Sequence, residues 1–207
     1  MSLKLYTSQV CPFAHRCRLM LAWKGLQSER MEIDLAAMPD WYRQLSPNQK
    51  VPLLDHDGQL IWESAIINEY LDDAFEDDHL LRSPLQRARA RLVIERVGSQ
   101  LIPAFYRLLR EPAPESFEAI QQAVEALPAD MDASGPFWLG PRASLADLAV
   151  YPWIERWGVL EHYRNLEVTW PGRVLEWRQA MSEHPAVLAE ARPGEFYVPG
   201  YARYANP

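Results

Sequence analysis

The stretch LKLYTSQVCPFA, residues 3–14, contains the signals that decide the first part of the fold. Leu3–Thr7 is a short apolar alternation typical of a strand, and Pro12 then opens a helical stretch that runs to Lys24. Proline suits the first turn of a helix because the N–H that it lacks has no intrahelical partner there. The stretch therefore predicts a strand, a loop and a helix, with the Cys11 thiol at the helix start.

Strand and helix signals continue to alternate up to about residue 75. Asp55–Gly58 is a strong hairpin turn, and Ser64 can cap the helix that follows the hairpin. The predicted strands are Glu29–Leu35, Val51–Leu54 and Gln59–Trp62, and the predicted helices are Asp40–Leu45 and Ala65–Phe75. Together with the first strand and helix, these elements give the order βαβαββα, which is an α/β arrangement.

Strand signals nearly vanish from Ser83 onward, where apolar residues recur at helical spacing. Ser144 and Asp147 have the spacing of a capping box at a helix start. The predicted helices are Ser83–Arg110, Glu115–Leu127, Leu148–Trp157, Trp170–Ser182 and Pro185–Ala191. The second part of the chain is therefore expected to be all-helical.

The charged stretch Asp73–Arg82 is the best candidate for a linker between the two parts. We therefore expect one domain over residues 1–77 and a second over residues 83–207. The aromatic tail Phe196–Tyr204 is interrupted by proline and glycine, so we expect it to lie extended rather than to form a helix.

The composition is that of a folded protein and argues against several classes of function. The chain has 207 residues, 48% of them hydrophobic, and a formal net charge of −7 with scattered Lys and Arg, which disfavours a nucleic-acid surface. No apolar run approaches the ~18 residues of a membrane span and no signal region opens the chain, so a cytoplasmic address without a membrane partner is expected. The five histidines show no ligand spacing, and no metal site is expected.

The position of Cys11 points to a reactive thiol. Unpaired N–H groups and the helix dipole stabilise a thiolate at a helix N-terminus, although many free cysteines are only small buried hydrophobes. Cys17 is separated from Cys11 by about 9 Å of helical rise, too far for a disulfide, and is expected in the core or on the flank of the helix. Position 14 is Ala14 rather than a second cysteine, so an external thiol would have to resolve a mixed disulfide. His15 is expected to face solvent.

A second group of residues, Lys50-Val51-Pro52 and Glu63-Ser64, fits the α-amino-acid end of a peptide. Ser64 at a helix start can bind a carboxylate, and Glu63 can hold an ammonium group. A cis Pro52 would turn the backbone of Val51 outward to pair with an extended peptide. In isolation, the same residues would be only a strand edge and a helix cap.

In this order, Cys11-Pro12-Phe13-Ala14, Lys50-Val51-Pro52 and Glu63-Ser64 resemble the motifs of cytosolic glutathione transferases. The chain looks most similar to their cysteine-type omega and dehydroascorbate-reductase group, whose members begin this helix with Cys-Pro-Phe. The box at Ser144 and Asp147 resembles the folding motif of the family, and the resemblance covers essentially the whole chain. It implies a thioredoxin-like domain followed by a helical bundle.

The resemblance also implies roles for the residues of the first domain. Cys11 would form a mixed disulfide with glutathione, and Phe13 would lie beside it. The backbone of Val51 would pair with the cysteinyl unit, with Pro52 as the cis-proline. Glu63 and Ser64 would hold the γ-glutamyl end of glutathione.

One position departs from the omega pattern. Omega-like enzymes typically carry a lysine for the glycyl carboxylate just before the Pro-x-Trp segment, whereas this chain has Met38 there. We expect Lys50 to meet that carboxylate instead.

The second substrate is expected beside the Cys11 helix and residues of the helical domain, for which Tyr106, Trp153 and Trp157 are the candidates. The two tryptophans are four residues apart and would share one helix face, but aromatic residues at this spacing are also typical of core packing. The resemblance further implies a homodimer formed through the helix Ser83–Arg110.

These observations favour a glutathione-dependent thiol transferase or reductase that works by thiol–disulfide exchange at Cys11. Two alternatives remain open. One is a noncatalytic regulator that resembles the bacterial stringent starvation proteins and binds RNA polymerase. The other is the reductive cleavage of glutathionyl hydroquinones, although relatives of that kind usually have longer chains.

Overall fold

The computed structural model describes residues 2–75, 79–81 and 83–206. The chain forms two compact units. The N-terminal unit comprises Met1–Leu80 together with Pro185–Glu190, and the helical unit comprises Leu81–His184 together with Ala191–Pro207. The sequence division into residues 1–77 and 83–207 did not anticipate that Pro185–Glu190 packs with the N-terminal unit.

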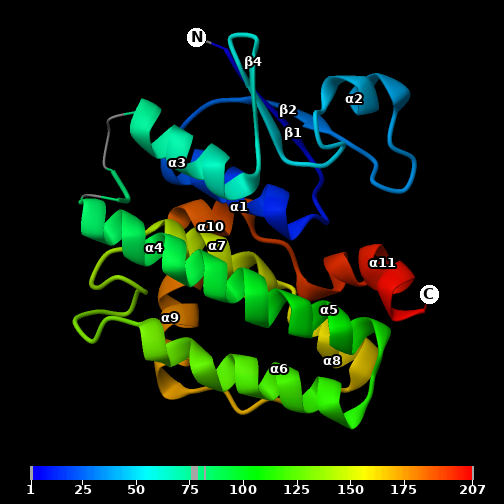
Figure 1. Ribbon diagram of the computed structural model, residues 1–207, viewed down its shortest axis with the longest axis vertical. Coiled ribbons are helices and arrows are strands. Elements are labelled where there is room, and N and C mark those ends of the chain that lie inside the picture. The colour runs from blue at the N-terminus through cyan, green and yellow to red at the C-terminus, as the bar shows by residue number, and fades with distance from the viewer. Residues whose placement is uncertain (1, 76–78, 82, 207) are drawn as a thin grey trace. The chain divides into compact units, whose positions relative to one another are not determined.

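A four-stranded sheet forms the centre of the N-terminal unit (Figure 1). The strands are β1 (Leu3–Thr7), β2 (Glu29–Glu32), β3 (Leu53–His56) and β4 (Gln59–Trp62), arranged in the order β2-β1-β3-β4. Strand β1 is parallel to β2 and antiparallel to β3, and β3 forms a hairpin with β4. This is the βαβαββα order predicted from the sequence, with the mixed sheet of a thioredoxin-like domain.

Four helices belong to the N-terminal unit together with this sheet. They are α1 (Pro12–Trp23), α2 (Asp40–Leu45), α3 (Ser64–Ala74) and α10 (Pro185–Glu190). Helix α1 packs against α3 and against α10, as Figure 1 shows. Its residues Pro12 and Ala14–Leu21 are all buried, so α1 is the central helix of the unit.

Several boundaries in this unit differ from the sequence predictions. Strand β2 ends at Glu32 rather than Leu35, and β3 begins at Leu53 rather than Val51, because Pro52 has no N–H to give to the ladder. Ser64 is the first residue of α3 rather than its cap; the cap position is Glu63, with φ at 67° and no side-chain capping bond. The predicted linker Asp73–Arg82 lies partly outside the described residues, and α3 extends into it as far as Ala74.

The helical unit is built from a bundle that the sequence predicted in outline. Its elements are α4 (Pro84–Arg96), η1 (Val97–Leu101), α5 (Ile102–Arg110), α6 (Pro114–Ala126), η2 (Leu127–Asp130), α7 (Leu145–Glu155), α8 (Gly158–Arg164), α9 (Gly172–Ser182) and α11 (Gly194–Ala205). Helices α4 and α5 follow one another as one long rod in Figure 1, joined by the π-helical segment η1. The predicted helix Ser83–Arg110 is thus confirmed, with Ser83 as its cap.

Asp147 organises the start of α7 in the core of the helical unit. Its Oδ2 accepts hydrogen bonds from the backbone N (2.7 Å) and the Oγ (2.8 Å) of Ser144, which confirms the capping box. Its Oδ1 accepts from Trp138 N at 3.1 Å and from Trp177 Nε1 at 2.8 Å. Burial raises the pKa of Asp147 to about 6, and the hydrogen bonds from Trp138, Ser144 and Trp177 oppose that rise.

The prediction of an extended tail was wrong, because residues 194–205 form helix α11. Tyr197, Tyr201 and Ala205 are buried at four-residue spacing, and this packing outweighs the break that Pro199 predicted. Arg164 holds the end of α11 by donating to the carbonyl oxygen of Ala205 at 2.6 Å. Helix α8, which provides Arg164, was not predicted from the sequence.

No helix of the described residues is long and apolar enough to span a membrane. The described residues also contain no group of three or more His, Cys, Asp or Glu side chains placed to hold a metal ion.

Candidate active site

Cys11 occupies the N-cap position of α1, with its thiol directed at the first turn of the helix. Its backbone is extended, with φ at −79° and ψ at 119°, and its Sγ accepts a hydrogen bond from Ala14 N at 3.5 Å. The Sγ also lies 3.9 Å from the carbonyl oxygen of Val51. The thiol is only partly buried. A partly exposed sulfur that accepts a helix N–H is the arrangement that favours a thiolate nucleophile.

Arg16 brings a positive charge to this end of α1. Its side chain is buried, its Nη1 donates to Ser64 Oγ at 3.3 Å, and its Cζ lies 5.2 Å from the centre of the Phe13 ring. Burial lowers the pKa of Arg16 to about 10, and the electrostatic interactions with Cys17 and Cys11 oppose this fall. Arg16 is therefore still a cation at neutral pH, close enough to Cys11 for their charges to interact.

Arg18 fixes the loop that leads into Cys11. Its Nη1 donates to Thr7 Oγ1 at 2.9 Å and to the Ser8 carbonyl at 3.0 Å. The same Ser8 carbonyl accepts the N–H of Cys11 at 3.0 Å. Arg18 is fully buried and pairs with Glu190 of α10 at 3.3 Å, and Glu190 also pairs with Arg30 of β2 at 2.6 Å, so α10 is linked to two elements of the N-terminal unit.

One pocket brings together all six residues that the sequence analysis assigned to glutathione. Beside Cys11, it is lined by Phe13, Asn48, Lys50, Val51, Pro52, Glu63 and Ser64. The Val51–Pro52 peptide bond is cis, as expected from the sequence. The pocket combines a carboxylate, a hydroxyl and an ammonium group, which are the groups needed to bind a zwitterionic peptide end and a second carboxylate.

Asn48 is the member of this pocket that the sequence analysis did not identify. In the sequence it stands in the stretch Ser46-Pro47-Asn48, which follows the helix Asp40–Leu45. Its Nδ2 donates to Glu63 Oε1 at 3.1 Å, across 15 residues of chain. No local signal reveals this contact, since asparagine is also an ordinary turn residue.

Met38 and His15 are explained by packing. Met38 packs against the core cluster that contains Tyr42, Val51 and Leu53, so the position where omega-like enzymes carry a lysine is apolar here. His15 is fully buried, and the prediction that it faces solvent was wrong. It belongs to the run Ala14–Leu21 of α1, which is buried throughout, and α1 packs against both α3 and α10.

The three candidates for the second substrate have different surroundings in the helical unit. Trp153 and Trp157 are 0% and 2% exposed, which favours core packing over contact with a substrate. Helix α7 ends at Glu155, before Trp157. The prediction that the two tryptophans share one helix face was therefore wrong. Tyr106 is partly exposed and stacks on Tyr201, with ring centres 6.2 Å apart.

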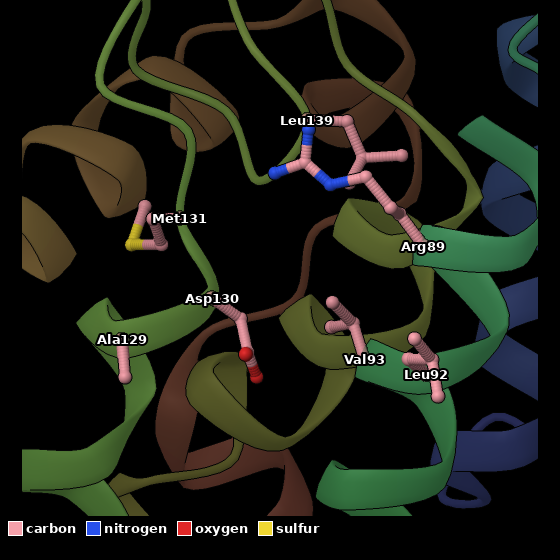
Figure 2. Close-up of a pocket in the computed structure, with 7 residues that line it drawn as sticks. All are labelled: Arg89, Leu92, Val93, Ala129, Asp130, Met131 and Leu139. Carbon is pink, nitrogen blue, oxygen red and sulfur yellow. The ribbon is translucent and has the colours of Figure 1, made fainter. Parts of the chain in front are cut away.

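The helical unit has a pocket of its own (Figure 2). It is lined by Arg89, Leu92, Val93, Ala129, Asp130, Met131 and Leu139. Both charged side chains of this pocket already form ion pairs, Arg89 with Asp132 at 3.1 Å and Asp130 with Arg96 at 2.7 Å. The pocket beside Cys11 is therefore the better candidate for chemistry.

The sequence matches the family model of the glutathione S-transferase N-terminal domain over residues 10–74 and that of the C-terminal domain over residues 85–189. These matches cover more than half of the chain, which thus belongs to the glutathione transferase family.

Within this family the chain is omega-like. It is 32% identical over 200 residues to glutathione S-transferase omega-1 of Mus musculus, covering 94% of this chain and 82% of the mouse protein. Among solved structures, it matches glutathione transferase Omega 3C of Trametes versicolor with a TM-score of 0.88 and 29% identity, covering 99% and 90% of the two chains. The comparisons give no support to a regulator resembling the stringent starvation proteins.

A third similar protein is rice GST1, whose structure was solved in complex with glutathione. It matches with a TM-score of 0.84 and 27% identity, covering 99% of this chain and 96% of the rice chain.

Proposed function

We propose that this chain is a glutathione-dependent thiol transferase or reductase in which Cys11 carries glutathione as a mixed disulfide. The observation that carries the proposal is the Cys11 thiol itself, partly exposed and accepting the Ala14 N–H at the start of α1. A transferase that only activates glutathione needs a hydroxyl group to stabilise the glutathione thiolate. A cysteine in that place competes as a nucleophile and favours exchange.

The exchange has two steps. In the first, the Cys11 thiolate attacks the glutathione sulfur of a mixed disulfide, the S–S bond breaks, and the substrate leaves as a thiolate that takes a proton from water. In the second, the thiolate of another glutathione attacks the Cys11–glutathione disulfide and releases oxidised glutathione and free Cys11. Each cycle therefore consumes one free glutathione thiol: the disulfide between substrate and glutathione is exchanged for that of oxidised glutathione, and the substrate sulfur becomes a thiol. An oxidised small molecule such as dehydroascorbate would instead gain two electrons and two protons from two glutathione thiols.

Ala14 and Cys17 support an external resolving thiol. Position 14 holds no sulfur, and Cys17 is fully buried with its Sγ 3.7 Å from the Ser64 carbonyl oxygen. Burial raises the pKa of the Cys17 thiol well above its usual range, against the nearby charges of Arg16 and Arg18. A buried, protonated thiol is a poor nucleophile, so glutathione must do the resolving.

The pocket beside Cys11 is the proposed glutathione site. The Val51 backbone would pair with the cysteinyl unit, Ser64 would bind the γ-glutamyl carboxylate, and Glu63 would accept the ammonium group. Lys50 is exposed at the rim, where it can meet the glycyl carboxylate. Tyr106 is the residue of the helical unit that we propose for the second substrate.

We also propose a homodimer with α4 in the interface. Leu85 and Leu92 lie seven residues apart on α4, and each is 70% exposed. Two turns of helix separate them, so they lie on one side of α4. Light scattering should give twice the 23.9 kDa of one chain, and a value near 23.9 kDa would contradict the dimer.

The function is tested by measuring the intact mass of the reduced protein after brief exposure to oxidised glutathione near neutral pH, followed by peptide mapping. We expect one glutathione adduct at Cys11, removed by added reduced glutathione. The absence of an adduct, or equal labelling of Cys11 and Cys17, would contradict the proposed function.

A further inference from the structure

Asn48 connects the two segments that form the pocket beside Cys11. One segment is the turn Ser46–Lys50, which leads into Val51 and Pro52, and the other is Glu63 with the start of α3. The Asn48 Nδ2 donates to Glu63 Oε1 at 3.1 Å, and both residues line the pocket. Asn48 is therefore in direct contact with the carboxylate that is proposed to accept the ammonium group.

The orientation of the Asn48 amide is fixed by its neighbours. The backbone N of Lys50 lies 3.1 Å from Asn48 Oδ1, and a backbone N–H can only donate, so the atom facing it must be the oxygen. The hydroxyl of Ser46 lies 3.2 Å from the same oxygen. The Asn48 Nδ2 is therefore on the side away from the turn, where it donates to Glu63.

The contact with Asn48 matters because few other contacts restrain the Glu63 side chain. It is exposed, it follows β4 directly, and its side chain makes no capping bond to α3. Its backbone is in the left-handed region, with φ at 67°, which is uncommon for a residue with a side chain. An exposed glutamate loses rotamer freedom when it binds a ligand, and prior ordering by Asn48 removes part of that cost.

We propose that Asn48 is a positioning residue that orders the Glu63 carboxylate for the ammonium group of the γ-glutamyl unit. By donating to Oε1, Asn48 directs Glu63 so that its other oxygen can accept from the ammonium. Asn48 belongs to the turn that leads into Val51. The same turn therefore presents the Val51 backbone and orders the carboxylate that selects a γ-glutamyl group. This inference rests on the proposed function, since it takes glutathione to be the ligand of the pocket.

The substitution Asn48→Asp tests this role. It keeps an oxygen for Lys50 N and Ser46 Oγ, so the turn is retained, but it replaces the donor to Glu63 with a second carboxylate. We expect S-methylglutathione, which cannot exchange, to bind about tenfold more weakly in titration calorimetry, since hydrogen bonds to charged groups have this magnitude. In turnover with a disulfide substrate, the KM for glutathione should rise while kcat stays close to that of the parent.

An analogue without the amino group separates positioning from a general loss of structure. The S-methylated peptide glutaryl-Cys-Gly lacks only the α-ammonium of glutathione. We expect this analogue to bind the parent more weakly than S-methylglutathione does. The substitution Asn48→Asp should then lower the affinity for the analogue by less than a further twofold. Gln59→Glu is the matched control, because it adds the same charge at the other end of β4, and it should leave both affinities unchanged.

Two results would overturn the inference. One is an equal loss of affinity for both peptides, which would mean that Asn48 only supports the turn, and the other is unchanged affinity for S-methylglutathione. If circular dichroism shows that Asn48→Asp does not fold, Asn48→Ala is measured in its place and must show the same selective loss.

The binding assay also distinguishes this inference from the proposed function. A selective loss on Asn48→Asp in a protein that forms no Cys11 adduct would support the role of Asn48 and contradict the exchange reaction. A parent protein that does not bind S-methylglutathione would contradict both.

Discussion

Cys11 and Cys17 lie on the same helix, yet their surroundings differ in burial and in hydrogen bonding. Cys11 is partly exposed at the N-cap of α1, where its Sγ accepts the Ala14 N–H and its thiol lies 3.9 Å from the Val51 carbonyl oxygen, whereas Cys17 is fully buried and donates to the Ser64 carbonyl oxygen. Accepting an N–H stabilises the charged thiolate, and donating a proton stabilises the neutral thiol. The difference teaches that position on the helix, more than residue type, determines which sulfur can react.

The largest expected effect comes from removing the Cys11 sulfur, compared with removing the Cys17 sulfur. Cys11→Ser should lower thiol exchange by about 10³-fold or more, because a serine hydroxyl has no comparable anion at neutral pH. Cys17→Ala should change the exchange rate by less than about twofold, at a stability cost of about 1 kcal/mol for the lost contacts of the buried sulfur. The rates are measured with a glutathione mixed disulfide as substrate.

The pH dependence of alkylation supplies the control for this pair. Because burial raises the pKa of Cys17, iodoacetamide should leave Cys17 unmodified throughout the neutral range while Cys11 reacts. Labelling of Cys17 in the folded parent at a rate similar to that of Cys11 would show that the two thiols do not differ as the structure indicates.

A second, smaller effect is expected from the support of the Cys11 loop. Glu190→Gln removes the charge that neutralises the buried Arg18, whose other partners are Thr7, Ser8 and Gln9. Breaking a buried ion pair from one side costs about 3 kcal/mol, so urea unfolding should show a loss of this size. We also expect a several-fold slower reaction of Cys11, because the Ser8 carbonyl that holds its N–H is less well fixed.

Glu29→Gln is the matched control for Glu190→Gln. Glu29 pairs with Lys4 at 3.1 Å in the same unit, but the Glu29 side chain is 57% exposed and the Lys4 side chain 28%. Surface pairs contribute little, so this change should affect neither stability nor the reactivity of Cys11. Equal destabilisation by the two substitutions would rule out a special role for the buried pair.

The smallest expected effect concerns the rim of the pocket beside Cys11. Lys50→Ala should weaken glutathione binding about threefold to fivefold, and less at high salt, because Lys50 is exposed and its charge is screened. Lys4→Ala, which removes a partly exposed charge from β1, is the control. An unchanged glutathione affinity in Lys50→Ala would refute the assignment of Lys50 to the glycyl carboxylate.

Much of the fold was predictable because its signals are local. The alternation at Leu3–Thr7, the proline at the start of α1 and the turn at Asp55–Gly58 each act within a few residues, and these elements formed as expected. The tail shows where local signals fail. Pro199 predicted a break, but the buried face of Tyr197, Tyr201 and Ala205 stabilises α11 through distant contacts.

The sequence by itself determined the order of elements, the place of Cys11 at a helix start and six of the seven residues that line the pocket beside it. These depend on backbone propensity and on motifs whose spacing is fixed along the chain. Only the tertiary structure decided that Asn48 contacts Glu63, that Arg18 pairs with Glu190, and that Trp153 and Trp157 are buried. Such contacts join residues far apart in sequence, and they depend on packing geometry that no local pattern encodes.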